Sequence, residues 1–108
     1  EPVLKCAPEL KTNDFFLAAA VDHAYHFGSA NFCGSSIEKA FERKQSAKAC
    51  SLFNTKADGV TPAWVYVKAG KDDLGKWKYK TLPGLIKRAA ARRELCEKGL
   101  ESVGMDNR

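Results

Sequence analysis

Apolar side chains recur at every third or fourth position in three stretches of the chain, and this spacing predicts three helices. The first helix follows the capping candidates Thr12, Asn13 and Asp14, whose side chains can accept hydrogen bonds from the free N–H groups of a first turn. Gly28 stands where a helix commonly ends, because glycine readily adopts a left-handed conformation. We therefore expect a helix that begins within residues 12–14 and ends before Gly28.

The second and third helices are predicted from the same spacing. Ser35 and Glu38 form a capping box, and the apolar positions that follow predict one unbroken helix over residues 36–50. The third helix follows Pro83 and is expected to end near Gly99.

Two segments rich in β-branched and aromatic residues, 63–68 and 76–81, flank a loop of seven residues and predict an antiparallel hairpin. Residues 3–6 could form a further strand, but four residues do not decide this. Residues 101–108 form a polar tail that is expected to fray. The pattern indicates one α+β domain over residues 1–100, in which about three helices pack on a small antiparallel sheet.

The four cysteines of the 108-residue chain are widely separated, at Cys6, Cys33, Cys50 and Cys96. The chain has no C-x-x-C or C-x-x-H pair, which disfavours structural zinc because such a site needs two close ligands on one turn. An even number of distant cysteines favours two disulfides and an extracellular compartment, with reduced buried thiols as the alternative. We expect a secreted protein, and a start at Glu1 without a basic and apolar leader fits a mature chain after signal cleavage.

The helix predicted over residues 36–50 limits how the cysteines can pair. It would span about 21 Å, and the short segment between Cys33 and its first residue recovers only about 10 Å. Because a disulfide needs Cα atoms within about 7 Å, Cys33 is not expected to pair with Cys50, and this also removes the complementary bridge Cys6–Cys96. Two patterns stay open: Cys6–Cys33 with Cys50–Cys96, and Cys6–Cys50 with Cys33–Cys96.

The net charge of +5 comes from one part of the chain. Residues 1–67 carry seven basic and seven acidic side chains, whereas residues 68–98 carry ten basic and four acidic ones. The predicted hairpin and third helix therefore form the basic region, which favours acidic or polyanionic partners. No apolar run is long enough to cross a bilayer, so membrane insertion is not expected, and the sequence predicts no cofactor.

In the second predicted strand three lysines alternate with two aromatic residues, so the lysines share one face and the rings the other. We expect a register that buries the valines of the first strand against Trp77 and Tyr79 and leaves the lysines beside Trp64 and Tyr66. The predicted contact surface, extended by the third helix, consists of Trp64, Tyr66, Lys68, Lys76, Lys78, Lys80, Arg88 and Arg92. Such a surface suits a protein or an anionic polymer, either a single-stranded nucleic acid or a glycan, because lysines contact phosphates or sulfates while rings stack on bases or sugars. The alternative is a solvated face that protects a strand edge.

Asp22, His23 and His26 form a D-H-x-x-H cluster in the first predicted helix. The simplest interpretation is that a histidine near the helix end interacts with the helix dipole and with an acidic residue one turn earlier. Two alternatives stay open: the histidines bind a metal ion, or they act as acid and base in RNA cleavage. Two neighbours on one helix are poorly placed to flank a phosphate, which disfavours cleavage. Asp72 and Asp73, between glycines, are interpreted as turn residues of the hairpin loop.

The start of the chain resembles the opening of small secreted effector proteins of plant-pathogenic fungi. The resemblance covers roughly the first 27 residues and is carried by a short strand ending in cysteine and by a following helix, Val3-Leu4-Lys5-Cys6 and Asp14-Phe15-Phe16-Leu17-Ala18-Ala19-Ala20. Some of these effectors look like ribonucleases that have lost their catalytic residues. The resemblance therefore implies secretion, a role in virulence and binding to a host target rather than turnover, and it carries over no catalytic residue. The rest of the chain departs from the ribonuclease-like pattern, because it is predicted to finish in a helix.

The function expected from the sequence is that of a secreted, disulfide-stabilised interaction protein of effector type, which binds a host macromolecule through its basic and aromatic surface. The alternative is a small secreted ribonuclease-like enzyme that uses His23 or His26.

Overall fold

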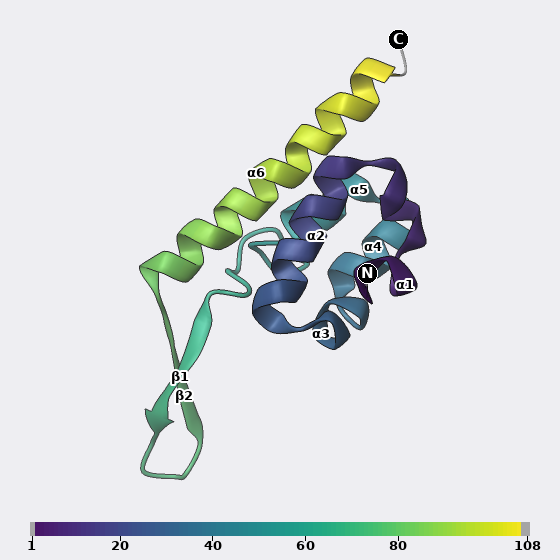
Figure 1. Cartoon of the computed structure of the whole chain (residues 1–108). Helices are drawn as coiled ribbons and strands as arrows, with labels where there is room; N and C mark the ends of the chain where they lie inside the picture. Colours follow the sequence, from purple (N-terminus) through teal and green to yellow (C-terminus); the bar gives the residue numbers. More distant parts are fainter. Residues whose placement is uncertain (1, 107–108) are drawn as a thin grey trace.

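The computed structural model describes residues 2–106 and shows an α+β protein that is mainly helical (Figure 1). In chain order, its elements are helix α1 (Pro2–Cys6), the 3₁₀ helix η1 (Pro8–Thr12), helices α2 (Asp14–Phe27), α3 (Ser29–Cys33), α4 (Ser36–Glu42) and α5 (Ser46–Ser51), strands β1 (Tyr66–Lys71) and β2 (Trp77–Thr81), and helix α6 (Pro83–Asp106). The α+β class and the antiparallel hairpin are as predicted. The described residues form six α-helices rather than three.

The helices pack on one another and not on the sheet. Helix α6 lies along α2 and α5, and the hairpin projects from this helical body (Figure 1). The largest buried apolar side chains come from the helices and from the segment that follows α5, namely Val3, Leu10, Phe16, Phe32, Ile37, Phe41, Leu52 and Phe53. Strands β1 and β2 are exposed at every position except Val67, which is half-buried. The expectation that helices pack on the sheet is wrong, because the hairpin projects from the helical body and leaves both faces of its strands exposed (Figure 1).

The first predicted helix is confirmed as α2. Its N-cap is Asn13, whose Oδ1 accepts hydrogen bonds from the backbone N–H groups of Phe15 and Phe16, and Gly28 follows its last turn with a φ of 94°. The side-chain amide of Asn13 also donates to the carbonyl of Gly99, at 3.2 Å. The cap of α2 therefore holds this helix against α6 as well.

Gly99 does not end the third predicted helix, which continues as α6 to Asp106. A Cβ atom at Gly99 would lie 2.6 Å from ring carbons of Phe16. Glycine is needed here because two helices approach closely, and not because the chain must leave the helix. The residues predicted as a frayed tail are helical as far as Asp106, and residues 107–108 lie outside the described residues.

The possible strand over residues 3–6 is also a helix, α1. Pro2 suits the first turn of a helix, because its missing N–H has no partner to lose there. The N–H of Ala7 then donates to the carbonyl of Val3, and the Val3 side chain is fully buried. The strand that contributes to the resemblance with fungal effectors is therefore replaced by a helical turn.

The second predicted helix is broken in two, because the chain turns at Lys44. Helix α4 ends at Glu42, the N–H of Gln45 donates to the carbonyl of Ala40, and the N–H of Lys44 donates to the carbonyl of Phe41. Lys44 itself has a φ of 61°. These two hydrogen bonds and the left-handed residue form a Schellman motif, the usual helix stop, with lysine at the position that glycine normally occupies. The prediction of one helix over residues 36–50 is therefore wrong.

Two disulfides join Cys6 to Cys33 and Cys50 to Cys96, with Cα–Cα distances of 5.7 and 5.4 Å. The first connects α1 to α3, and the second connects α5 to α6. This is one of the two patterns that the sequence left open, although the unbroken helix used to exclude Cys33–Cys50 is absent. The disulfides therefore fasten α1 and α6 covalently to other helices of the helical body.

Candidate binding surface: the hairpin arm

Residues 66–81 form a hairpin arm, which consists of β1, β2 and the loop between them. Asp72 organises the loop: its Oδ1 accepts hydrogen bonds from the N–H groups of Leu74 and Lys76, and its carbonyl accepts one from Gly75. Gly75 has a φ of 78°, a conformation that side chains disfavour. The interpretation of Asp72 as a turn residue is confirmed. The loop therefore holds the two strands together at the tip of the arm.

The register of the strands decides which side chains share a face. The opposed pairs are Tyr66 with Thr81, Val67 with Lys80, Lys68 with Tyr79 and Lys71 with Trp77, with an irregularity between Lys68 and Lys71. Opposed residues share a face, and so do alternate residues along a strand. The three rings, Tyr66, Trp77 and Tyr79, therefore lie on one face, and Val67 lies on the other face with Lys78 and Lys80.

The predicted register, which set the valines against Trp77 and Tyr79, is wrong by one residue. That register assumed that the rings would enter a buried layer. Within residues 65–82, all of which the structure describes, Val65 alone is buried, and its carbonyl accepts a hydrogen bond from the N–H of Leu82. Beyond this anchor the strands leave the helical body, so no core is present to receive the rings.

The rings of the arm are open to solvent. Tyr66 is 42% exposed, Trp77 is 47% exposed and Tyr79 is 60% exposed. The Nζ atoms of Lys68 and Lys71 lie 4.5 and 4.9 Å from the centre of the Trp77 ring, which is cation–π distance. Positive charge and aromatic surface are therefore next to each other on the same face.

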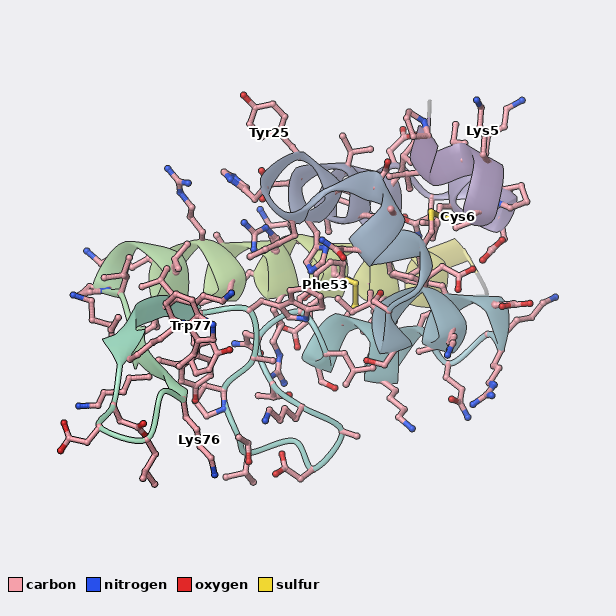
Figure 2. All side chains as sticks on the ribbon, turned by 90° about the horizontal axis from the view of Figure 1, so that it is seen from below. Lys5, Cys6, Tyr25, Phe53, Lys76 and Trp77 are labelled. Carbon is pink, nitrogen blue, oxygen red and sulfur yellow. A yellow bond between two sulfur atoms is a disulfide. The ribbon has the colours of Figure 1, made fainter. Side chains whose placement is uncertain are left out.

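The remaining lysines of the arm, Lys76, Lys78 and Lys80, are exposed as predicted, and Figure 2 shows Lys76 pointing away from the helices. With five lysines against Asp72 and Asp73, the arm carries a net charge of +3.

Two residues of the predicted surface lie elsewhere. Trp64, with a φ of 63°, turns into the helical body, where its ring centre lies 4.2 Å from that of His23 and 5.0 Å from that of Phe27. Arg92 is 2% exposed, and its Nε donates to the carboxylate of Asp22. Arg88 is exposed near the start of α6, with its Nη1 3.5 Å from Nδ1 of His26. The structure thus removes Trp64 and Arg92 from the exposed surface and leaves Arg88 accessible.

Trp77, Tyr79 and Lys71 were not among the residues predicted to make contacts. The alternation of residue types already placed both rings on one face of β2. It could not show whether that face meets the body or the solvent, because this depends on where the hairpin leaves the body.

The two histidines of the D-H-x-x-H cluster occupy different environments. His26 is exposed on α2, and its Nε2 lies 3.6 Å from Asp22, the pairing expected from the sequence. His23 is fully buried among the rings of Phe27, Phe32, Phe53 and Trp64. Burial, and then the neighbouring Arg92 charge, lower the pKa of His23 to about 4. A buried imidazole cannot reach a phosphate, so only His26 of the two histidines is accessible to a substrate. No group of three metal-ligating side chains is present in the described residues.

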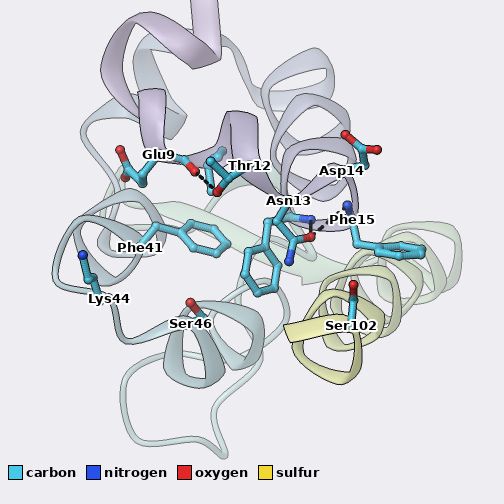
Figure 3. A pocket seen from close by; sticks show the side chains of 11 residues that line it. Glu9, Thr12, Asn13, Asp14, Phe15, Phe41, Lys44, Ser46 and Ser102 are labelled. Atoms are coloured by element: carbon cyan, nitrogen blue, oxygen red, sulfur yellow. Dashed lines mark hydrogen bonds between the residues drawn. The ribbon is translucent and has the colours of Figure 1, made fainter. Parts of the chain in front are cut away.

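A cavity of about 450 Å³ opens between η1, the start of α2 and the junction of α4 with α5 (Figure 3). Its lining includes Phe15, Phe41, Glu9 and Lys44, so apolar rings and both signs of charge are mixed. The N–H groups at the start of α2 are already bonded to Asn13. The backbone N–H groups of Phe15 and Phe16 are therefore not free to bind a ligand in this cavity.

No family model, curated protein or solved structure matches the chain. Among the residues that the structure describes, no helix combines the length and apolar character needed to cross a membrane.

Proposed function

We propose that this protein is a secreted, disulfide-stabilised binding protein of effector type, whose hairpin arm holds an anionic polymer of the host. The observation that carries the proposal is the arm, which exposes five lysines and three aromatic rings to solvent. An isolated two-stranded hairpin is only marginally stable in water, and this one contributes nothing to the core beyond its anchor at Val65. Lysines on such an element suit contact with an anionic partner better than they suit folding.

The two disulfides support the proposed secretion, because disulfides form and persist in oxidising compartments. They also fix the helical body that carries the arm. Positive charge continues from the arm into the first turns of α6, where Lys87 and Arg88 are exposed. The proposed contact surface is therefore the arm together with this start of α6.

The test is retention on immobilised heparin and on RNA as salt is raised. Replacing Lys76, Lys78 and Lys80 together by glutamate should abolish retention at moderate salt. The slope of log affinity against log salt should fall by about 2, because each lost phosphate contact removes roughly 0.7 from the slope for a single strand.

The matched control replaces three exposed lysines of the helical body, Lys11, Lys39 and Lys48, by glutamate. This control variant has the same net charge as the arm variant. If the arm is the binding site, the control variant should keep most of its retention. Equal losses of retention in the two variants would show that binding depends only on the net charge of the protein. Unchanged retention in the arm variant would show that the three lysines are solvated and do not contact the polymer.

A further inference from the structure

Resting on the proposed binding by the arm, we propose that the anionic polymer is a single-stranded nucleic acid. Its bases would stack on Tyr66, Trp77 and Tyr79, while its phosphates contact the lysines at the edges of the arm. The register of the two strands carries this proposal, because it places the three rings on one face of the arm.

The exposed aromatic side chains of the arm form a row. Trp77 and Tyr79 are two residues apart on β2, which separates their Cα atoms by about 6.8 Å. Tyr66 belongs to the same face on the neighbouring strand. Every base has a flat face that can stack on an aromatic side chain, so such a row accepts successive bases without requiring a particular sequence. The bases of a duplex are already stacked on one another, and only an unpaired strand can offer its faces to the rings.

The lysines of the arm place positive charge around these rings. Lys68 and Lys71 lie on the face of the rings, with their Nζ atoms within 4.9 Å of the Trp77 ring centre. Lys78 and Lys80 lie on the opposite face of a sheet that is only two strands wide. Strands lie roughly 4.8 Å apart, so long lysine side chains can reach past either edge of so narrow a sheet. A backbone that runs along the rings therefore passes cations on both sides.

Two other possible occupants fit the arm less well than a single-stranded nucleic acid does. A second copy of this chain would bring an arm of the same +3 charge to the sheet edge, and lysines at strand edges oppose such pairing. A sulfated glycan would satisfy the lysines and can place a sugar on a ring, but it lacks the flat bases that stack on successive rings. A single-stranded nucleic acid satisfies both kinds of side chain on the arm.

The experiment compares three probes at one salt concentration: a fluorescein-labelled oligouridylate of about ten nucleotides, within the usual ~4–16 nucleotide site size, a duplex RNA of the same length, and a heparin oligosaccharide. Binding is measured by anisotropy or by competition. The variant replaces Trp77 and Tyr79 by leucine, which leaves every lysine in place. The matched control is Tyr25→Leu, because Tyr25 is 83% exposed on α2 and points into solvent away from the arm (Figure 2).

We expect the wild type to bind the oligouridylate more tightly than the duplex. The double variant should lose at least tenfold in affinity for the oligouridylate and less than twofold for heparin, because stacking on one ring accounts for about tenfold. Oligouridylate should also quench the fluorescence of Trp77, and the Tyr25→Leu control should behave as the wild type.

The outcomes separate this inference from the proposed function. Binding of none of the probes would overturn both. Binding of heparin alone, tighter binding of the duplex, or equal losses of oligouridylate and heparin in the double variant would overturn the inference and leave polyanion binding in place.

Discussion

Lowering the pH is expected to destabilise this protein through His23. The imidazole is fully buried, and neither ring nitrogen has a hydrogen-bond partner among the described residues. The ring centres of Trp64 and Phe27 lie 4.2 and 4.8 Å away. Removal from water disfavours the charged imidazolium, and the Arg92 charge disfavours it further, so the pKa of His23 falls from 6.5 to about 4.

The sign and the size of the effect follow from this difference in pKa. Between pH 6.5 and pH 4 the unfolded chain binds a proton at His23 that the folded chain does not bind. The free energy of unfolding therefore falls as the pH falls through this window, and His23 causes no further loss below it. From about pH 7.5 to about pH 4.5 the contribution of His23 is about 2.5 kcal/mol.

The assay is urea unfolding at these two pH values for the wild type, His23→Leu and His26→Gln. Carboxylates also titrate in this range, but they do so in all three proteins, so the difference between proteins isolates the histidine. His23→Leu should lose about 2.5 kcal/mol less than the wild type on acidification, whereas His26→Gln, which keeps His23, should still show the loss that His23 causes. Equal losses in the wild type and His23→Leu would refute the reasoning. Titration of the His23 ring protons by NMR gives an independent value.

Three further predictions concern stability. Lys44→Gly should raise the free energy of unfolding by about 0.5–1 kcal/mol, because lysine is strained at its φ of 61°; Lys44→Ala, which keeps the Cβ, should give no such gain in the same urea unfolding assay. Gly99→Ala should cost about 1–3 kcal/mol, since its Cβ would lie 2.6 Å from a buried ring, whereas Gly84→Ala in open space should be neutral or slightly stabilising; equal thermal shifts would contradict the close approach of α2 and α6. Replacing Cys50 and Cys96 by serine should cost about 4 kcal/mol, as their bridge spans 46 residues, and a non-reducing peptide map that shows another pairing would contradict the fold.

The sequence predicts α2 well because both of its ends carry local signals. Asn13 bonds to N–H groups within three residues, and Gly28 adopts its positive φ with no help from distant parts of the chain. Local signals of this kind are independent of the fold, so they can be interpreted from neighbouring residues alone.

The errors arise where one residue type serves two purposes. Glycine stops helices and also permits close packing, and at Gly99 the second use applies because Phe16 lies against it. Lysine is a good helix former, so the stop at Lys44 is hidden, although the hydrogen bonds around it are those of an ordinary helix end. The role of Gly99 depends on a tertiary contact that a local pattern does not contain, and the stop at Lys44 is marked by no residue type that usually ends a helix.

The sequence predicts that the candidate surface lies on the hairpin, but it does not predict which face of the hairpin exposes the aromatic rings. The lysines at positions 76, 78 and 80 are exposed as expected, since charged side chains stay in water wherever the hairpin lies. The rings of Trp77 and Tyr79 could either pack in a hydrophobic core or contact a ligand from an exposed face. Which of the two applies depends on a shift of one residue in the register, and that shift follows from the anchor at Val65.

The most direct test of binding by the arm is an NMR titration of the ¹⁵N-labelled protein with the oligouridylate. If the arm binds the oligouridylate, the largest changes in amide chemical shift should occur in residues 66–81 and the first turns of α6. The signal of the Trp77 indole N–H should move, while that of Trp64 should stay in place. Shifts confined to the helical body, or the absence of shifts at concentrations that saturate heparin binding, would contradict the account.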